Sequence, residues 1–465
     1  MKSKWLKYPV YTLIGIAVLI LGLLITAVSL SRSDSFTQVA ADTEGAWLLV
    51  NARLAGANEQ PVNLFIQDGK IEQITSKADE LPTGVRVVDV EGQYLMPALM
   101  DSHAHIFEPT ALTRYLAHGV TTIRNMQGMP AHLRWREAQK QGQHTGSRML
   151  TATPTFNGNS DSGPFHKVVT NPDEVDSLLK DYKQQGYDFV KVYEGLSKEV
   201  AERLLAVAEI EGLPVSGHII HSMKVSEQIK GMRSIEHIED IFQSVLGFKY
   251  DAELMQKVAD ALKAEGTMVT TTMVAFEHIH RYGMQREQAA ETLPLETMNP
   301  MLLMMGEGGM QSWIEAEDNS WMERKYQGME KILLDLTRND IPLAVGSDTG
   351  PALTIPGYSL IEELMLLSKA GLDNQTIIEG VTLNNARLMG LAETHGQVRE
   401  GFIADLILLE SDPYEDLETL WEPKAVIQEG HYYGEQQLEK LNSVGQSHQS
   451  FFATAGVLLD HIWSL

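Results

Sequence analysis

The chain has 465 residues, of which 43% are apolar and 21% are charged, and its formal net charge is −25 at pH 7. This length accommodates a barrel of ~250 residues and a second domain, while the negative charge argues against nucleic acid and anionic lipid surfaces as partners. The sequence contains no cysteine, which excludes disulfides and thiolate zinc sites, so any metal must be held by histidine, carboxylate or modified lysine.

The N-terminal segment is predicted to carry the chain to a membrane. Lys2, Lys4 and Lys7 precede an uncharged run at 10–30, which is long enough for a transmembrane helix of ~20 residues. Secretory signals usually have shorter apolar cores of ~7–15 residues, which favours a retained anchor, although small residues at 39–41 leave cleavage and secretion open. The lysines place the N terminus in the cytoplasm and the remaining chain on the periplasmic, extracytoplasmic side of the inner membrane.

Short strands are predicted at both ends of the remaining chain. The first set lies at 46–54, 61–67, 70–74 and 85–90, with a hairpin turn signal at 68–69. The second set lies at 396–398, 404–409 and 425–429. Neither set has enough apolar surface to stand alone, so we expect both ends to meet in one small β-sandwich.

Between these ends, strand-like runs alternate with helical patterns. The eight runs lie at 95–105, 119–126, 148–153, 188–193, 214–218, 234–238, 268–273 and 342–348. Strands that alternate with helices form a parallel sheet, and eight of them close a barrel. The predicted fold class is therefore α/β, a (β/α)8 TIM barrel with a flanking β-sandwich and an N-terminal transmembrane helix.

Two stretches exceed this plan. Residues 276–331 are too long for one strand-to-helix connection, and such insertions are lids, partner surfaces or packed helices. Residues 451–465 are apolar enough to dock on the body or on a second subunit, which leaves a homo-oligomer open. The predicted order begins with a signal anchor and linker at 1–44 and the first sandwich part at 45–95. The barrel follows at 96–395, then the second sandwich part at 396–434 and a helical tail at 435–465.

Candidate metal ligands stand at the ends of five barrel runs. His103 and His105 are two residues apart, so on a strand their imidazoles point the same way and provide half of a transition-metal site. Barrels of this kind place their chemistry at the C-terminal ends of the strands. The other ligand candidates at such ends are Lys191, His218, His237 and Asp348.

Lys191 lies among aliphatic residues of a buried strand, where an ammonium group is costly unless it is paired or its charge is altered. One solution is carboxylation by CO₂ to a carbamate that bridges two cations, and the other is an ion pair with Asp348 or another acid. His218 and His237 are 19 residues apart, which suits one strand-helix-strand repeat. Singly each would more often be structural, but together they indicate a second metal.

These residues resemble the amidohydrolase superfamily, in its imidazolonepropionase-like and prolidase-like branch. The resemblance runs from about Trp47 to Tyr433, through segments at 96–105, 119–124, 188–193, 234–237, 346–348 and 401–406. It implies two divalent ions, zinc foremost, with manganese or cobalt also fitting. The more buried ion would take His103, His105 and Asp348, and the other His218 and His237. Carboxylated Lys191 would bridge them.

The resemblance further implies a hydroxide shared by the two ions as nucleophile, with Asp348 carrying its proton to the leaving nitrogen. The departures from the family pattern concern the substrate: Asn125 stands where members often carry an acid, and His221 is an additional histidine. Candidate substrate contacts are Tyr193, His221, Arg124, His278 and Arg281. No role is assigned to His118, His132, His144, His166 and His280.

The predicted function is hydrolysis of a C–N bond in a small amide, either a dipeptide or an N-acyl amino acid. One alternative is a cyclic-amide hydrolase, as in imidazolonepropionase-like members. Another is a catalytically silent, membrane-tethered binding protein, whose sequence signature would be the loss of a ligand. No ligand of the pattern is missing.

Overall fold

A closed parallel barrel forms the centre of the computed structural model, which describes residues 7–32, 36–57, 60–77, 80–158, 162–315, 319–350 and 352–465. The barrel strands are β6 (Leu99–Ala104), β7 (Val120–Asn125), β8 (Arg148–Thr151), β11 (Val190–Val192), β12 (Val215–Gly217), β13 (Ser234–Glu236), β14 (Met268–Thr270) and β15 (Leu343–Ala344). Isolated parallel bridges join Ala152 to Phe189 and Ala104 to Thr349, and these close the ring. The predicted barrel is confirmed.

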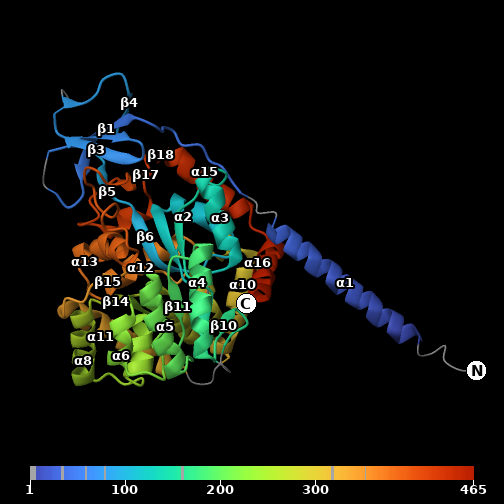
Figure 1. The fold of residues 1–465 in the computed structure, drawn as a ribbon. Helices are drawn as coiled ribbons and strands as arrows, with labels where there is room; N and C mark the ends of the chain where they lie inside the picture. Colours follow the sequence, from blue (N-terminus) through green and yellow to red (C-terminus); the bar gives the residue numbers. More distant parts are fainter. Residues whose placement is uncertain are drawn as a thin grey trace, which may run out of the picture.

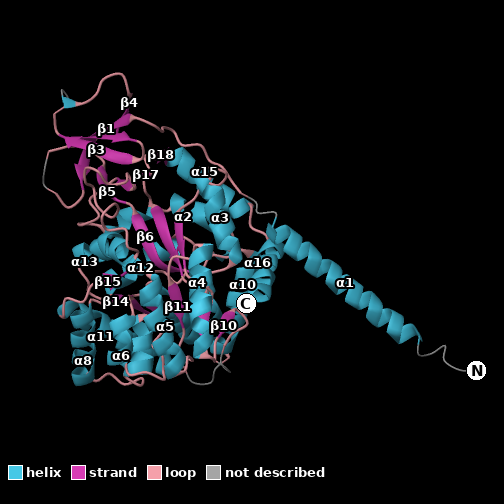
Figure 2. Cartoon of the chain, in the orientation of Figure 1, coloured by secondary structure: helices cyan, strands magenta, loops and turns pink. Residues whose placement is uncertain are grey.

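Helices surround these strands (Figure 2). They are α2 (Thr110–Ala117), α3 (Pro130–Lys140), α4 (Val175–Gln185), α5 (Lys198–Glu211), α6 (Val225–Gln228), α7 (Ile238–Asp240), α8 (Ala252–Glu265), α12 (Tyr358–Lys369), α13 (Asn374–Glu379) and α14 (Asn385–Leu388). The sequence of α5 explains its limits: Ser197 accepts a hydrogen bond from the Val200 N–H at the start, and Gly212 adopts a left-handed conformation at the end.

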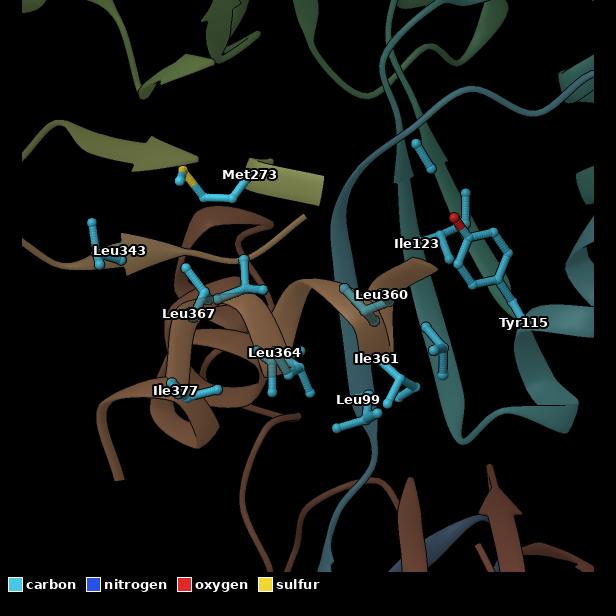
Figure 3. Packing of buried hydrophobic residues seen from close by; sticks show 14 of the residues in the cluster. Leu99, Tyr115, Ile123, Met273, Leu343, Leu360, Ile361, Leu364, Leu367 and Ile377 are labelled. Atoms are coloured by element: carbon cyan, nitrogen blue, oxygen red, sulfur yellow. The ribbon is translucent and has the colours of Figure 1, made fainter. Parts of the chain in front are cut away.

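The main apolar core lies between the barrel strands and these helices. Leu99 of β6 packs in one cluster with Leu360, Ile361 and Leu364 of α12, while Ile123 of β7 lies beside Tyr115 of α2 (Figure 3). The spacing of the α12 residues puts them on one helical face, as the 3.6-residue period requires. This packing fixes the strand ends that carry the candidate ligands.

The two chain ends pair in one eight-stranded sheet beside the barrel. Its strands are β1 (Trp47–Leu54), β2 (Val62–Gln67), β3 (Lys70–Thr75), β4 (Arg86–Asp89), β5 (Tyr94–Pro97), β16 (Leu406–Leu409), β17 (Ala425–Gln428) and β18 (His431–Gly434). A bridge from Lys70 to Ile403 folds the sheet back on itself around an apolar core that includes Trp47. β1 belongs to both halves of this sheet, and the two halves together enclose that core.

Several strand limits differ from the prediction. The run at 95–105 divides between β5, which pairs with β16, and β6, which enters the barrel. Residues 396–398 form no strand in the described part of the chain, whereas β18 was not predicted. Two further strands follow β8. They are β9 (Thr155–Asn157), which pairs with the barrel strand β11, and β10 (His166–Val168), which pairs with β9. They are too short and polar to carry a hydrophobic signature.

The long insertion and the tail are helical. The insertion holds α9 (Met273–Gln285), α10 (Pro300–Ile314) and α11 (Ser320–Arg338), and the tail holds α15 (Glu435–Ser447) and α16 (Phe451–Ser464). The tail docks on its own chain, since α15 packs against α2, and α16 against α3 and α10.

The N-terminal helix α1 (Lys7–Arg32) projects from the body (Figure 1). Its segment Tyr11–Ser29 is long and apolar enough to cross a membrane and is almost entirely exposed. It packs against α16, and Ala27, near its C-terminal end, is buried. The same features occur in anchors and in signal sequences.

A buried carboxyl group near the start of α2 makes the stability of the fold depend on pH. Burial raises the pKa of Glu108 from 4.5 to about 7, although Asn299 and Arg114 partly oppose the shift. Between pH 4.5 and about pH 7, Glu108 therefore stays protonated in the folded chain but is ionised in the unfolded chain. The free energy of unfolding consequently falls as the pH rises through this interval.

We expect Glu108→Gln to remove this dependence. Glutamine keeps an acceptor for the Asn299 amide, which lies 2.5 Å from Oε2 of Glu108. The free energy of unfolding of the variant, taken relative to that of the parent chain, should rise by on the order of 2 kcal/mol from pH 5 to pH 8. Thermal unfolding at both pH values measures this difference, and an equal effect at the two values would contradict it.

Candidate metal centre

Four of the predicted ligands, His103, His105, His237 and Asp348, meet at the C-terminal end of the barrel. Nε2 of His103 lies 3.4 Å from Oδ1 of Asp348, and Nε2 of His105 lies 3.2 Å from the same oxygen. Ligand atoms of His103, His237 and Asp348 all lie within 4.8 Å of one another. This spacing allows the three groups to belong to one metal centre.

The backbone at two of these strand ends adopts an uncommon conformation. His237 has φ 70° and Asp348 has φ 51°, although neither is a glycine. Left-handed conformations of such residues cost free energy and concentrate at functional sites. At Asp348 the neighbouring strand supports this geometry, because its N–H donates to the His103 carbonyl at 2.8 Å.

The polar atoms at the centre lack protein partners. Nε2 of His103 and Oδ1 of Asp348 are buried and make no hydrogen bond with the described residues, and the contacts between them lack hydrogen-bond geometry. A buried polar atom without a partner costs about 1–3 kcal/mol. Two imidazoles and a carboxylate are a suitable donor set for zinc, so the residues present fit a divalent ion.

Electrostatics favour the ligating forms of these side chains. Burial alone would raise the pKa of Asp348, but the imidazoles of His103, His105 and His237 hold it well below its ordinary value. Burial lowers the pKa of His103 to about 4 and places that of His237 well below its ordinary value. Neutral imidazole and ionised carboxylate are the forms that bind metals.

Lys191 and His218 complete the predicted set on the neighbouring strands. Lys191 is 2% exposed in β11 and lines the same cavity. Burial lowers its pKa to about 8, while Glu236 and Asp348 oppose the shift. The ring centre of His218 lies 4.9 Å from that of His237, and its Nδ1 lies 3.7 Å from Oδ2 of Asp240.

A buried carboxylate that the sequence reasoning missed orients His103. Oε2 of Glu236 lies 2.7 Å from Nδ1 of His103, which directs Nε2 of the same ring to the centre. Oε1 of Glu236 accepts from Arg124 at 2.5 Å. Burial opposes ionisation of Glu236, but Arg124 and His103 hold its pKa well below the ordinary value. Such carboxylate–histidine pairs fix the tautomer of a metal ligand.

The ligands lie at the bottom of a cavity of about 610 Å³. Among the predicted substrate contacts, Tyr193 and His221 line this cavity. So does His166, to which no role was assigned; its ring centre lies 4.8 Å from that of Tyr193. Glu194 and Asp240 also line it near His218 and were not predicted. His166 lies on the unpredicted strand β10, so no sequence signal placed it here.

Three other predicted substrate contacts lie outside the cavity. Arg124 lies beneath the centre, where its guanidinium binds Glu236 and the Ser102 carbonyl. His278 is buried and bonded to the Ala352 carbonyl at 3.0 Å. Arg281 pairs with Glu277 along α9 at 2.6 Å. In each case the side chain is held by protein groups and does not line the cavity.

The sequence of the chain is similar to a known family and to several known proteins. A sequence profile of the amidohydrolase family matches residues 94–431. Imidazolonepropionase of Klebsiella pneumoniae (strain 342) is 23% identical over 450 residues, spanning 80% of this chain and 93% of that protein. Ochratoxinase of Aspergillus niger is 34% identical over 104 residues, which are 22% of this chain and 19% of that protein.

Solved structures with the same fold extend this likeness. A bottromycin amidohydrolase superposes with a TM-score of 0.72 at 24% identity, over 92% of this chain and 94% of that chain. A Xaa-Pro dipeptidase with methionine bound in its active site superposes with a TM-score of 0.64 at 18% identity, over 84% of this chain and 100% of that chain. At these identities the likeness concerns the fold.

Proposed function

The chain belongs to the amidohydrolase family and is a metal-dependent hydrolase of carbon–nitrogen bonds, and we propose that its substrate is an N-acyl amino acid or a dipeptide. The observation that carries this proposal is the meeting of His103, His237 and Asp348, with buried unpartnered atoms, at the bottom of a cavity. These ligands stand at the strand ends where barrels place their chemistry.

Two divalent ions, zinc foremost, are proposed for this centre. His103, His105 and Asp348 would hold one ion, His218 and His237 the other, and Lys191 would bridge them as a carbamate. When bound, such ions polarise an amide carbonyl and lower the pKa of water towards ~7. The burial of Lys191 beside the ligands, within the same cavity, supports the bridging role.

Asp348 is the proposed proton carrier. Its carboxylate lies within 3.2–3.4 Å of two imidazoles and lines the cavity, where it can accept a proton from the attacking water. The same carboxyl group then protonates the leaving nitrogen, which makes the amine a better leaving group. Glu236 supports this geometry by holding the His103 ring.

The cavity favours the acyl or peptide substrate over the cyclic amide. Tyr193, His221 and His166 contribute polar groups to the cavity lining, and Phe107, Phe276, Ile279, Leu302 and Met310 contribute apolar surface. A small polar ring would leave most of this apolar wall without contact. Tyr193 and His221 are therefore proposed to contact the polar end of the substrate and the apolar wall its acyl or side-chain end.

We further propose that α1 anchors the enzyme in the inner membrane, with the catalytic part on the periplasmic side. The exposed apolar surface of Tyr11–Ser29 supports this role, and Lys2, Lys4 and Lys7 before it support the orientation. Secretion after signal cleavage is the alternative. The mass of the mature chain in a membrane fraction distinguishes the two.

Chelation should abolish turnover reversibly. We expect the full chain to hydrolyse N-acyl amino acids or dipeptides, to lose at least about 10³-fold in kcat after metal removal, and to recover with added zinc, manganese or cobalt. A panel of N-acyl amino acids, dipeptides and cyclic amides measures this, with heat-treated protein as control. Turnover of cyclic amides alone would favour the alternative, and binding of metal without any turnover would favour the silent binding protein.

A further inference from the structure

One wall of the cavity is an unusually apolar helix. α10 contributes Leu302, Met305, Gly306, Gly309 and Met310 to the lining, and Glu307 is the single ionisable residue in its sequence. Met305, which lines the cavity, is also 42% exposed. Large exposed apolar side chains that continue into a cavity indicate a surface for an apolar ligand or a membrane.

The C-terminal helix α16 contacts both α10 and a second segment that lines the cavity. Asn299, which caps the start of α10, donates from its amide to Oγ1 of Thr454 at 3.0 Å. On the other side, Nε2 of His461 bonds the carbonyl of Phe165, a cavity-lining residue, at 2.9 Å. α16 therefore holds two parts of the cavity lining that lie far apart in the sequence.

The same helix is the part of the body that touches α1. Ala27 of α1 is buried, and Arg32 pairs with Asp460 of α16 at 3.3 Å. The ends of α16 expose Phe452 and Trp463, which are 57% and 64% exposed, and aromatic residues of this kind are typical of membrane interfaces. Figure 1 shows α1 leaving the molecule beside α16, α10 and β10. The proposed anchor and the apolar cavity wall thus lie on one side of the molecule.

We propose that the substrate is an amide with a long acyl chain, an N-acyl amino acid held in the bilayer, and that it reaches the centre along α10 from the membrane surface. This inference rests on the proposed function, which it narrows to a lipid-like substrate. The reaction consumes one water, breaks the amide C–N bond and releases a fatty carboxylate and an amino acid. The acyl chain lies against Leu302, Met305 and Met310, with the amide at the ligands.

The first test is the dependence of turnover on acyl length. The full chain is assayed in neutral detergent with N-acetyl, N-butanoyl and N-octanoyl derivatives of one amino acid, each below its micellar concentration. Each buried methylene contributes about a fourfold gain, so we expect kcat/KM to rise at least about 100-fold from acetyl to octanoyl. A flat profile with measurable acetyl hydrolysis would leave the proposed function intact and overturn this inference.

Two adjacent methionines of α10 provide matched variants. Met305 lines the cavity, whereas Met304 does not. We expect Met305→Gln to lower the octanoyl-to-acetyl ratio of kcat/KM about tenfold and Met304→Gln to leave this ratio unchanged. Equal effects of the two substitutions would contradict the placement of the acyl chain on this helix.

The route from the membrane is tested in vesicles. The full chain is reconstituted in phosphatidylcholine vesicles, and an N-hexadecanoyl amino acid is supplied either in the same vesicles or in separate ones. Faster hydrolysis in the shared vesicles supports access through the bilayer, and equal rates overturn it. If no derivative is hydrolysed, binding is measured instead by calorimetry on the chelator-treated chain. The octanoyl derivative should bind at least about 100-fold more tightly than the acetyl derivative. Equal affinities would overturn the acyl site independently of catalysis.

Discussion

Lys191→Ala should lower the bound divalent metal from two equivalents per chain to one or fewer. It should also lower kcat/KM for the best amide substrate at least about 10³-fold, because a Lewis-acid ion stabilises the transition state by several kcal/mol and about 1.4 kcal/mol is a factor of ten. The reason is geometric: Lys191 is buried among the ligands at the bottom of the cavity. Elemental analysis of the full chain, beside steady-state kinetics, measures both quantities.

Three further variants show which property of Lys191 matters. Lys191→Arg keeps a positive charge that cannot become a carbamate, so it should behave like the alanine variant. Lys191→Glu restores a carboxylate and should regain part of the metal. Lys198→Ala removes a lysine at the start of α5, outside the cavity lining, and should change neither quantity. A single equivalent that Lys191→Ala leaves unchanged would exclude the carbamate and favour a one-metal hydrolase built on His103, His105, His218 and Asp348.

Glu236→Gln should weaken metal binding about 10–100-fold, the usual effect of removing a carboxylate that orients a ligating histidine. The expectation follows from the 2.7 Å contact between Oε2 of Glu236 and Nδ1 of His103. Glu236→Leu should in addition lower the free energy of unfolding by about 3–5 kcal/mol, because Arg124 would keep a buried charge without its partner. Competition with a coloured chelator measures the affinity, and denaturant unfolding of metal-free protein measures the stability.

A double variant separates these two roles of Glu236. Glu236→Leu combined with Arg124→Leu removes both charges, so most of the lost stability should return while metal affinity stays low. Asp405→Asn is the matched control, since Asp405 is also buried and accepts from Arg148 at 3.0 Å far from the centre. It should lower stability without lowering affinity. Recovery of affinity in the double variant would contradict the orienting role of Glu236.

The predictable part of the site consists of residues at strand ends. His103, His218, His237 and Asp348 each follow an apolar run, and the fold brings such ends to one face whatever the helices between them do. Lys191 could be predicted for another reason, since an ammonium among aliphatic residues has few stable solutions. These inferences need only the order of strands and the alternation of side chains along them.

Depth inside the barrel could not be predicted in the same way. Arg124 precedes the last residue of β7, yet its side chain lies below the centre, because the tilt and stagger of the strands decide which layer each inward residue joins. Glu236 belongs to that layer too, one residue before His237. A sequence gives the alternation of faces but not the stagger between neighbouring strands.

The walls of the cavity include segments whose position could not be predicted from a periodic pattern of apolar residues. His166 arrives through β10, a strand of three residues outside the ring. α10 is apolar enough to be assigned to a core, and only its packing between the cavity and α16 shows that it is a wall. Contacts between α10 and α16 join residues about one hundred and fifty positions apart, and no local pattern encodes such pairs.

The sheet made from both chain ends has a consequence for biosynthesis. β1, β2 and β3 are synthesised roughly 350 residues before β16, β17 and β18, which at about 5–20 residues per second is a delay of about 20–70 s. During this delay the nascent strands present open hydrogen-bonding edges and the uncovered indole of Trp47, both of which favour aggregation. The barrel strands are synthesised before β16, β17 and β18, so the barrel can assemble before the neighbouring sheet is complete. The sheet is completed only after these last three strands have been released from the ribosome. Slow translation before β16 would prolong the time during which chaperones must cover the exposed edges of β1, β2 and β3. Truncation after the barrel would leave these edges exposed permanently.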